Sequence, residues 1–245
     1  MNDGELLLYY QSQMDGDGRL LGAEALLRWQ PPGQAMVAPA DFIPVAEDSG
    51  LILPMGRWVL ETACRQLVAW AAHPATRSLQ VAVNISARQF RQNDFITQVR
   101  AVLAETGADP ARLVFELTES LVLENVEHVI RTMHVLKDWG IGFSLDDFGT
   151  GYSSLAYLKR LPLNELKIDQ GFVRDIPGDA DSCVIAQAIH ALGKSLRLNV
   201  IAEGVETEAQ RDFLAGHGCN AFQGYLYGRP GPAELIGSLA RNGPS

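Results

Sequence analysis

Short apolar runs alternate with longer amphipathic stretches from Leu79 to the end of the chain. The short runs predict strands and the longer stretches predict helices, because strands repeat every two residues and helices every 3.6. The predicted strands are Leu79–Ile85, Leu113–Leu117, Gly142–Asp146, Glu165–Asp169, Asn199–Ala202 and Ala221–Gln223. The predicted helices are Asp94–Thr106, Asn125–Trp139, Ser153–Lys159, Asp181–Leu196, Thr207–Ala215 and Ala233–Arg241. This alternation indicates repeated βα units.

Two further strands are predicted ahead of these units, at Glu5–Gln13 and Gly22–Trp29. The segment between them, Met14–Leu20, is short and rich in Asp and Gly, which favours a hairpin because a parallel crossover needs about a dozen residues. Helices near Ala40–Asp48 and Leu53–Ala72 then return the chain to the parallel pattern. The fold class predicted is therefore α/β, a modified TIM (β/α)8 barrel with the first strand antiparallel to the rest.

The amino-acid composition serves mainly to exclude classes of function. The 245 residues are 47% hydrophobic and show no Gly/Ser-rich linker, so residues 1–245 are predicted to form a single domain. A net charge of −9 argues against binding to DNA or RNA polymers. Three cysteines without C-x-x-C spacing favour a reducing, cytoplasmic setting. No signal peptide and no apolar run of membrane-spanning length is found, so no membrane contact is expected.

Ionisable and amide side chains stand at the C-terminal ends of the predicted strands, where α/β barrels build their active sites. These residues are Glu24, Arg28, Asn84, Glu116, Asp146, Asp147, Lys167, Asp169, Glu203 and Gln223. Each carboxylate alone could be a helix cap or a surface charge. Gathered at one barrel mouth, they would repel one another unless protons or cations neutralised them. Oxygen donors without His or Cys favour hard divalent cations.

Three local features allow more than one interpretation. Lys167 could balance charge or polarise a nucleophile, form an ion pair with Asp169, or act as a Schiff-base lysine of an aldolase. The run Asp15–Gly18 hints at a calcium loop, but Leu26 stands where such a loop needs glutamate, which favours the hairpin. Trp29 could belong to the core or line the barrel mouth.

An ordered set of short motifs carries a family resemblance. The set is Glu24–Trp29, Asn84–Ser86, Glu116–Glu119, Asp146–Leu155, Leu166–Asp169, Ala202–Glu206 and Gln223–Tyr225. In this order the motifs resemble those of the EAL family of cyclic di-GMP phosphodiesterases, from about Leu7 to Pro230. The resemblance implies a phosphoric diester hydrolase that converts cyclic di-GMP to linear pGpG with two metal ions, and so lowers this second messenger in bacterial signalling.

The resemblance also implies a role for each matching residue. Glu24, Asn84, Glu116 and Asp146 resemble ligands of a first metal ion, and Asp146 resembles a bridge to a second ion that Asp147 also holds. Asp169 is a further candidate for the surroundings of the second metal. The metals expected are two Mg²⁺ or Mn²⁺ ions, with Ca²⁺ inhibitory because its looser coordination would misplace the attacking water.

Four residues are expected to act beside the metals. Lys167 resembles the lysine that contacts the attacking water, and Glu203 resembles a glutamate that completes the second metal site or serves as base. Arg28 resembles an arginine that binds a substrate phosphate, and Gln223 resembles a glutamine beside the metal site. Glu119 resembles a residue that anchors the loop Phe148–Ser153. No metal position departs from the family pattern.

The expected partners are cyclic di-GMP, a second copy of the chain in a homodimer, and upstream GGDEF or sensory domains. The domain could have been excised from such a multidomain protein, since its amino terminus is short for the family. One rival function stays open beside the aldolase: a barrel that binds cyclic di-GMP without cleaving it.

Overall fold

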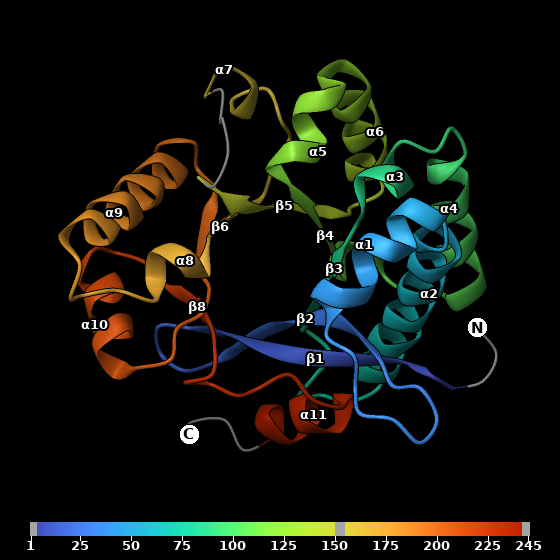
Figure 1. Cartoon of the computed structure of the whole chain (residues 1–245), viewed down its shortest axis with the longest axis horizontal. Helices are drawn as coiled ribbons and strands as arrows, with labels where there is room; N and C mark the ends of the chain where they lie inside the picture. Colours follow the sequence, from blue (N-terminus) through green and yellow to red (C-terminus); the bar gives the residue numbers. More distant parts are fainter. Residues whose placement is uncertain (1–3, 150–154, 242–245) are drawn as a thin grey trace.

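The structure is a computed structural model that describes residues 4–149 and 155–241. Its strands form a closed barrel in the order β1 to β8 (Figure 1). The strand bounds are β1 Leu6–Asp15, β2 Leu20–Trp29, β3 Gln80–Asn84, β4 Leu113–Thr118, β5 Gly142–Phe148, β6 Glu165–Ile168, β7 Asn199–Ala202 and β8 Ala221–Gln223. Strand β1 runs antiparallel to both of its neighbours, β2 and β8, and the other neighbouring pairs are parallel. The predicted barrel with a reversed first strand is confirmed.

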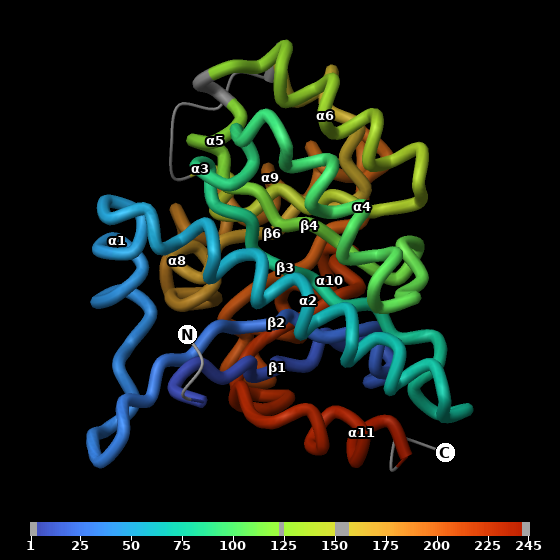
Figure 2. The backbone as a smooth tube through the Cα atoms, turned by 90° about the vertical axis from the view of Figure 1, so that its right-hand side faces the viewer, coloured from blue at the N-terminus to red at the C-terminus, as the bar shows by residue number. Residues whose placement is uncertain are grey.

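Helices surround this barrel, as Figures 1 and 2 show from two directions. The longer helices are α1 Pro39–Ser49, α2 Ile52–Ala71, α4 Phe95–Thr106, α6 Val126–Asp138, α9 Ala180–Ser195, α10 Glu208–Gly216 and α11 Ala233–Arg241. The shorter ones are α3 Ala87–Phe90, α5 Glu119–Glu124, α7 Leu155–Leu158, α8 Gln170–Val173 and the 3₁₀ turn η1 Pro110–Arg112. None of the described helices is both long and apolar enough to cross a lipid bilayer.

The turn between β1 and β2 explains why the first strand is reversed. Asp15 Oδ1 accepts hydrogen bonds from the backbone N–H groups of Asp17 (2.9 Å) and Arg19 (2.8 Å). The Asp15 N–H in turn donates to the Arg19 carbonyl at 2.8 Å. Because Asp side chains stabilise tight turns in this way, the acidic run serves the hairpin rather than a calcium site.

Successive residues of the strands face alternately outward to the helices and inward to the barrel axis. Phe115 and Leu117 of β4 are fully buried in the apolar layer beneath the helices. In this layer Phe115 lies next to Phe143 of β5, with ring centroids 6.0 Å apart. Glu116, between Phe115 and Leu117, points the other way and is also buried, at 1% exposure. The alternation therefore delivers polar side chains to the inside of the barrel.

The sequence-based boundaries differ from the structure at the barrel mouth and at the first hairpin, where β1 ends at Asp15 rather than Gln13 and β2 begins at Leu20 rather than Gly22. Strand β5 continues two residues beyond the predicted end, to Phe148. Strand β6 ends one residue early, because Asp169 caps α8 by accepting the N–H of Gly171 at 2.9 Å. The short helices α3, α5 and α8 were not predicted, since four to six residues carry no periodic apolar stripe. The predicted helix Ser153–Lys159 begins outside the described residues. Within them, the structure has the short helix α7 in this region.

Candidate active site at the barrel mouth

Lys167 of β6 lies at the centre of a cluster of carboxylates inside the barrel. Its Nζ is 2.6 Å from Glu203 Oε1, 2.8 Å from Glu116 Oε1, 3.5 Å from Glu24 Oε2 and 3.7 Å from Asp146 Oδ1. The lysine side chain is completely buried. These four acids come from β2, β4, β5 and the residue after β7, so the barrel unites residues far apart in sequence. The predicted convergence of carboxylates is observed.

Two amide side chains hold the Glu24 carboxylate from opposite sides. Asn84 Nδ2, at the end of β3, donates to Glu24 Oε1 at 2.6 Å. Gln223 Nε2, at the end of β8, donates to Glu24 Oε2 at 2.5 Å. Since the amide nitrogen of Asn84 is used in this bond, its oxygen is the atom that can serve as a neutral ligand.

The surrounding carboxylates determine the direction in which the pKa of Lys167 is shifted. Burial would lower the pKa of Lys167, but the attraction of Glu116, Glu203, Glu24 and Asp146 outweighs burial and raises it well above its ordinary value. These attractions favour the charged ammonium form of Lys167. This state disfavours the Schiff-base interpretation, which requires a neutral amine. The contacts also differ from the alternative pairing with Asp169, whose side chain caps α8.

The carboxyl groups divide into two kinds. Burial raises the pKa of Glu116 well above its usual value, and repulsion from Glu24 adds to this effect. Burial likewise raises the pKa of Glu203 to about 8, although Lys167 opposes the shift. For Glu24, burial also acts upward, but Lys167 and the hydrogen bonds from Gln223 and Asn84 outweigh it, so its pKa is lowered.

Glu116 provides the clearest sign that the cluster suits a metal cation. Among the described residues neither of its carboxylate oxygens has a hydrogen-bond partner of normal geometry, although Oε1 forms the ion pair with Lys167. No three His, Cys, Asp or Glu side chains of residues 4–149 and 155–241 already form a metal cage. A buried carboxylate without a hydrogen bond is costly, so a divalent cation that competes with Lys167 for these oxygens would satisfy it.

The end of β5 places two adjacent carboxylates at the mouth. Asp147 has a positive φ of 54°, which is uncommon for a residue other than glycine. Its N–H donates to Asp146 Oδ1 at 2.9 Å, so the bend is fixed by the neighbouring side chain. Burial, with repulsion from Asp146 and Asp169, raises the pKa of Asp147. Both residues line the cavity at the barrel mouth.

A cavity of about 380 Å³ opens above the cluster. Its lining includes the predicted residues Glu24, Arg28, Asp146, Asp147, Asp169, Glu203 and Gln223. Arg28 donates to the Leu27 carbonyl at 2.9 Å and lies 5.9 Å from the centroid of the Tyr9 ring. Burial lowers its pKa, and Glu24 opposes this shift. Arg28 is the only cationic side chain among the described residues of this lining.

Other residues of this lining escaped the sequence-based prediction: Gln11, Leu26, Gln170, Gly204, Glu206, Gly224, Tyr225 and Pro230. Most of them lie in the segments after the strands, whereas the sequence-based prediction considered only the residues at the strand ends. The half-exposed Tyr225 ring lies 4.1 Å beneath the Arg229 guanidinium, measured to the ring centroid. The quoted motifs ended at Tyr225 and so contained it, but assigned it no role.

Glu119 does not line this cavity. It begins α5, is 7% exposed, and has no hydrogen-bond partner for either carboxylate oxygen within the described residues. Residues 150–154 of the loop that it was predicted to anchor lie outside the described residues. Its anchoring role therefore stays a prediction.

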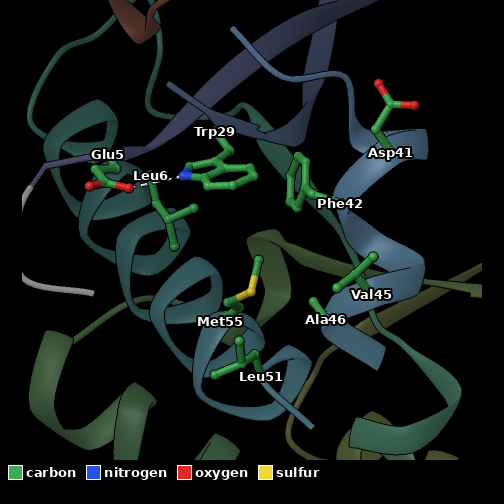
Figure 3. A pocket seen from close by; sticks show the side chains of 9 residues that line it. All are labelled: Glu5, Leu6, Trp29, Asp41, Phe42, Val45, Ala46, Leu51 and Met55. Carbon is green, nitrogen blue, oxygen red and sulfur yellow. Dashed lines mark hydrogen bonds between the residues drawn. The ribbon is translucent and has the colours of Figure 1, made fainter. Parts of the chain in front are cut away.

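Figure 3 shows a second cavity, of about 390 Å³, between the end of β2 and helices α1 and α2. Trp29 packs edge-on against Phe42, with ring centroids 5.8 Å apart, and its Nε1 donates to Glu5 Oε2 at 3.0 Å. Met55 and Leu51 complete a mainly apolar lining. Trp29 therefore lies away from the carboxylate cluster, and the described residues that line this cavity include no Lys, Arg or His.

Comparisons with known proteins agree with this geometry. The profile of the EAL domain family matches residues 1–230. The chain is 46% identical over 238 residues to the bifunctional diguanylate cyclase/cyclic di-GMP phosphodiesterase MucR of Pseudomonas aeruginosa, which covers 96% of this chain and 35% of MucR. It is 42% identical over 233 residues to the cyclic di-GMP phosphodiesterase PdeR of Escherichia coli, which covers 95% of this chain and 35% of PdeR. The chain thus spans about a third of the length of these curated relatives.

A solved structure, described as the PaMucR phosphodiesterase in complex with c-di-GMP, superposes on this chain with a TM-score of 0.91 at 45% identity. The superposition covers 95% of this chain and 94% of that one. The two chains therefore share one fold over nearly their whole length.

Proposed function

Because the chain belongs to the EAL domain family, we propose that it is a phosphodiesterase that hydrolyses cyclic di-GMP to linear pGpG. The observation that carries the proposal is the convergence of Glu24, Glu116, Asp146 and Glu203 on Lys167 at the barrel mouth. The names of MucR and PdeR, and the c-di-GMP complex of the MucR phosphodiesterase, supply the substrate.

The proposal includes two Mg²⁺ or Mn²⁺ ions. Glu24, Asn84, Glu116 and Asp146 would hold the first ion, and Asp146 and Asp147 the second, with Asp169 nearby. When bound, such ions neutralise charge on the phosphoryl group and make a water-derived nucleophile available near neutral pH. The donor set supports this assignment, because it offers only oxygen atoms and includes the buried, unsatisfied Glu116. Added Ca²⁺ is expected to inhibit.

The side chains of the chain itself bind, orient and hold protons. Lys167 would direct a donor toward the attacking water, since its ammonium group remains charged. Glu203 would accept a proton from that water in its ionised form: burial raises its pKa to about 8 in the metal-free chain, and nearby cations would favour the ionised carboxylate. Arg28 would bind a non-bridging phosphate oxygen at the edge of the cavity. Gln223 would orient Glu24 through their hydrogen bond.

Three further parts of the proposal concern the setting. The domain would work in the cytoplasm, as part of a longer protein with GGDEF or sensory domains, as the name of the bifunctional MucR suggests. It would also form a homodimer. Val184 and Ile185 of α9 are 64% and 37% exposed, which supports an apolar outer face on that helix.

The test is incubation of the purified chain with cyclic di-GMP and Mg²⁺, followed by chromatographic quantification of pGpG. We expect product with Mg²⁺, none after chelation, and at least a 100-fold slower reaction for Asp146→Asn, by analogy with roughly 10²-fold or larger losses on removal of key electrostatic groups. Binding of cyclic di-GMP without any pGpG would support the rival function, a binding module, and would overturn the hydrolase proposal.

A further inference from the structure

Three glutamine side chains form a hydrogen-bonded chain inside the barrel that ends on Glu24. Gln13 Nε2 donates to Gln223 Oε1 at 3.0 Å. Gln223 Nε2 donates to Glu24 Oε2 at 2.5 Å and to Gln11 Oε1 at 3.3 Å. Gln11 Nε2 donates to the carbonyl of Gly228 at 3.2 Å. Gln11, Gln13, Gln223 and Glu24 are all no more than 8% exposed, so water competes weakly for these bonds.

The direction of every bond in this chain is fixed at its two ends. An ionised carboxylate and a backbone carbonyl can only accept hydrogen bonds, so the nitrogen of Gln223 must face Glu24 and the nitrogen of Gln11 must face Gly228. The oxygen of Gln223 is then turned toward β1, where Gln13 supplies its donor. Gln13 is therefore the residue that stabilises the one amide orientation of Gln223 in which Glu24 receives a hydrogen bond.

Strand β1 is placed to supply this donor because it is the antiparallel strand that closes the barrel. Gln11 lies opposite Glu24 in the pairing with β2, and Gln13 lies opposite Gln223 in the pairing with β8. The β1–β2 register shifts between Gln13 and Met14. Such an irregularity re-aims the side chain beside it.

We propose that Gln13 is a positioning residue for metal binding, which acts through the Gln223 amide to hold the Glu24 carboxylate in place. The inference rests on the proposed function, since it assigns Glu24 to a metal ion. Gln13 itself is two hydrogen bonds away from Glu24, through Gln223, and need touch neither the metal nor the substrate. Removing a direct hydrogen-bond partner of a metal ligand, as Gln223 is of Glu24, typically changes metal affinity about 10–100-fold, so the effect relayed from Gln13 is expected at the lower end of that range.

The test is the Mn²⁺ dissociation constant of the whole chain, measured by electron paramagnetic resonance without substrate. Gln13→Met preserves the length of the side chain but removes its donor, so Gln223 Oε1 loses its partner. We expect Gln13→Met to weaken Mn²⁺ binding about tenfold. Thr76→Val is the matched control, because it removes another buried hydrogen bond, from Thr76 Oγ1 to the Trp70 carbonyl at 2.7 Å, in the turn that follows α2. It should lower stability and leave the Mn²⁺ affinity unchanged.

A double-variant cycle separates positioning from a general loss of packing. If Gln13 acts through Gln223, then Gln13→Met has no further effect on Mn²⁺ affinity in the Gln223→Met background. Wild-type affinity in Gln13→Met, or effects of the two substitutions that simply add, would overturn the inference while leaving the proposed hydrolase intact. A wild-type chain that binds no Mn²⁺ would instead contradict the metal-dependent function on which the inference rests.

Discussion

At the residue scale, the site depends on one buried lysine that balances several buried carboxylates. Lys167 is enclosed on the barrel axis by groups from four other elements. The sequence predicted that these residues stand at strand ends, but not which acids face the lysine. The suggested pairing of Lys167 with Asp169 was wrong, because the chain bends after Ile168 and Asp169 caps α8. A helix as short as α8 leaves no clear pattern in the sequence. Only the structure therefore shows that Asp169 caps this helix instead of pairing with Lys167.

Substitution of Lys167 by methionine should destabilise the chain and abolish turnover. The change leaves the Glu24 carboxylate, whose pKa is lowered, buried without its cation, and breaking a buried ion pair typically costs about 3–5 kcal/mol. Urea unfolding in the presence of a chelator measures this loss. Lys194→Met on the exposed face of α9 is the control, and its unfolding free energy should stay within about 0.5 kcal/mol of wild type. Equal stability of the two variants would show that Lys167 does not neutralise the cluster.

The raised carboxyl pKa values predict how the metal-free chain responds to pH. Glu203 binds a proton more tightly in the folded state, where its pKa is about 8, than in the unfolded state, where it is 4.5. Its contribution to stability is therefore full below pH 4.5 and is lost as the pH rises to about 8. Glu116 acts in the same direction. The lowered pKa of Glu24 stabilises the fold above pH 4.5 and is lost only below that pH, and the raised pKa of Lys167 stabilises it below pH 10.5 and is lost only above that pH, so neither changes stability between pH 5 and pH 8.

The chelated protein should accordingly lose unfolding free energy between pH 5 and pH 8, as measured by urea titration across that range. The loss should be smaller in Glu203→Gln, which cannot take up the proton. A slope that is the same in both proteins would refute the assignment to Glu203.

At the element scale, the loops that follow the strands pack against one another and complete the lining of the cavity. The backbone after β8 closely approaches the loop after β7: the Val205 N–H donates to the Gln223 carbonyl, and the Leu226 N–H donates to the Val205 carbonyl, each at 3.0 Å. Gly224 lies between these bonds, and a Cβ atom there would lie 2.1 Å from the Val205 oxygen. This glycine stood in a quoted motif, but only the structure gives its reason, which is the absence of space.

Gly224→Ala should therefore destabilise the chain by about 1–3 kcal/mol, as overpacking of a rigid contact generally does. It should also weaken substrate binding, because Gly224 and Gln223 both line the cavity. Gly216→Ala is the matched control, since no atom lies within 4 Å of the added Cβ. Chemical denaturation of both variants decides: equal midpoints would mean that the two loops can separate without cost.

Helix α5 carries the second test at this scale. Glu119 is buried at its start without a hydrogen-bond partner among the described residues, and it is expected to anchor the loop 148–153. Glu119→Ala should increase hydrogen exchange in that loop and lower turnover. Unchanged turnover together with unchanged metal affinity would count against the anchoring role.

At the scale of the whole molecule, the barrel was largely predictable, whereas the cavity lining was predictable only in part. Alternating apolar patterns gave the parallel strands, and the acidic turn at Asp15–Gly18 gave the reversed strand, because both are local signals. The cavity lining comes largely from residues beyond the strands, such as Glu206, Gln170 and Tyr225. Their approach depends on how separate loops pack, and no local pattern encodes that. The glutamines of β1 likewise showed their role only once the barrel was closed.

Two copies of the chain are expected to associate as a homodimer. Light scattering coupled to gel filtration should give a mass about twice that of the 26.7 kDa chain. A purely monomeric species across micromolar concentrations would remove the homodimer from the account, without affecting the chemistry of the barrel mouth.

The most direct test of the central claim is anomalous diffraction at the manganese edge, from crystals of the chain grown with Mn²⁺ and cyclic di-GMP. The account predicts two anomalous peaks at the barrel mouth. The first should contact oxygen atoms of Glu24, Asn84, Glu116 and Asp146, and the second should contact Asp146 and Asp147. Cyclic di-GMP bound in the cavity with no anomalous peak among these carboxylates would contradict it.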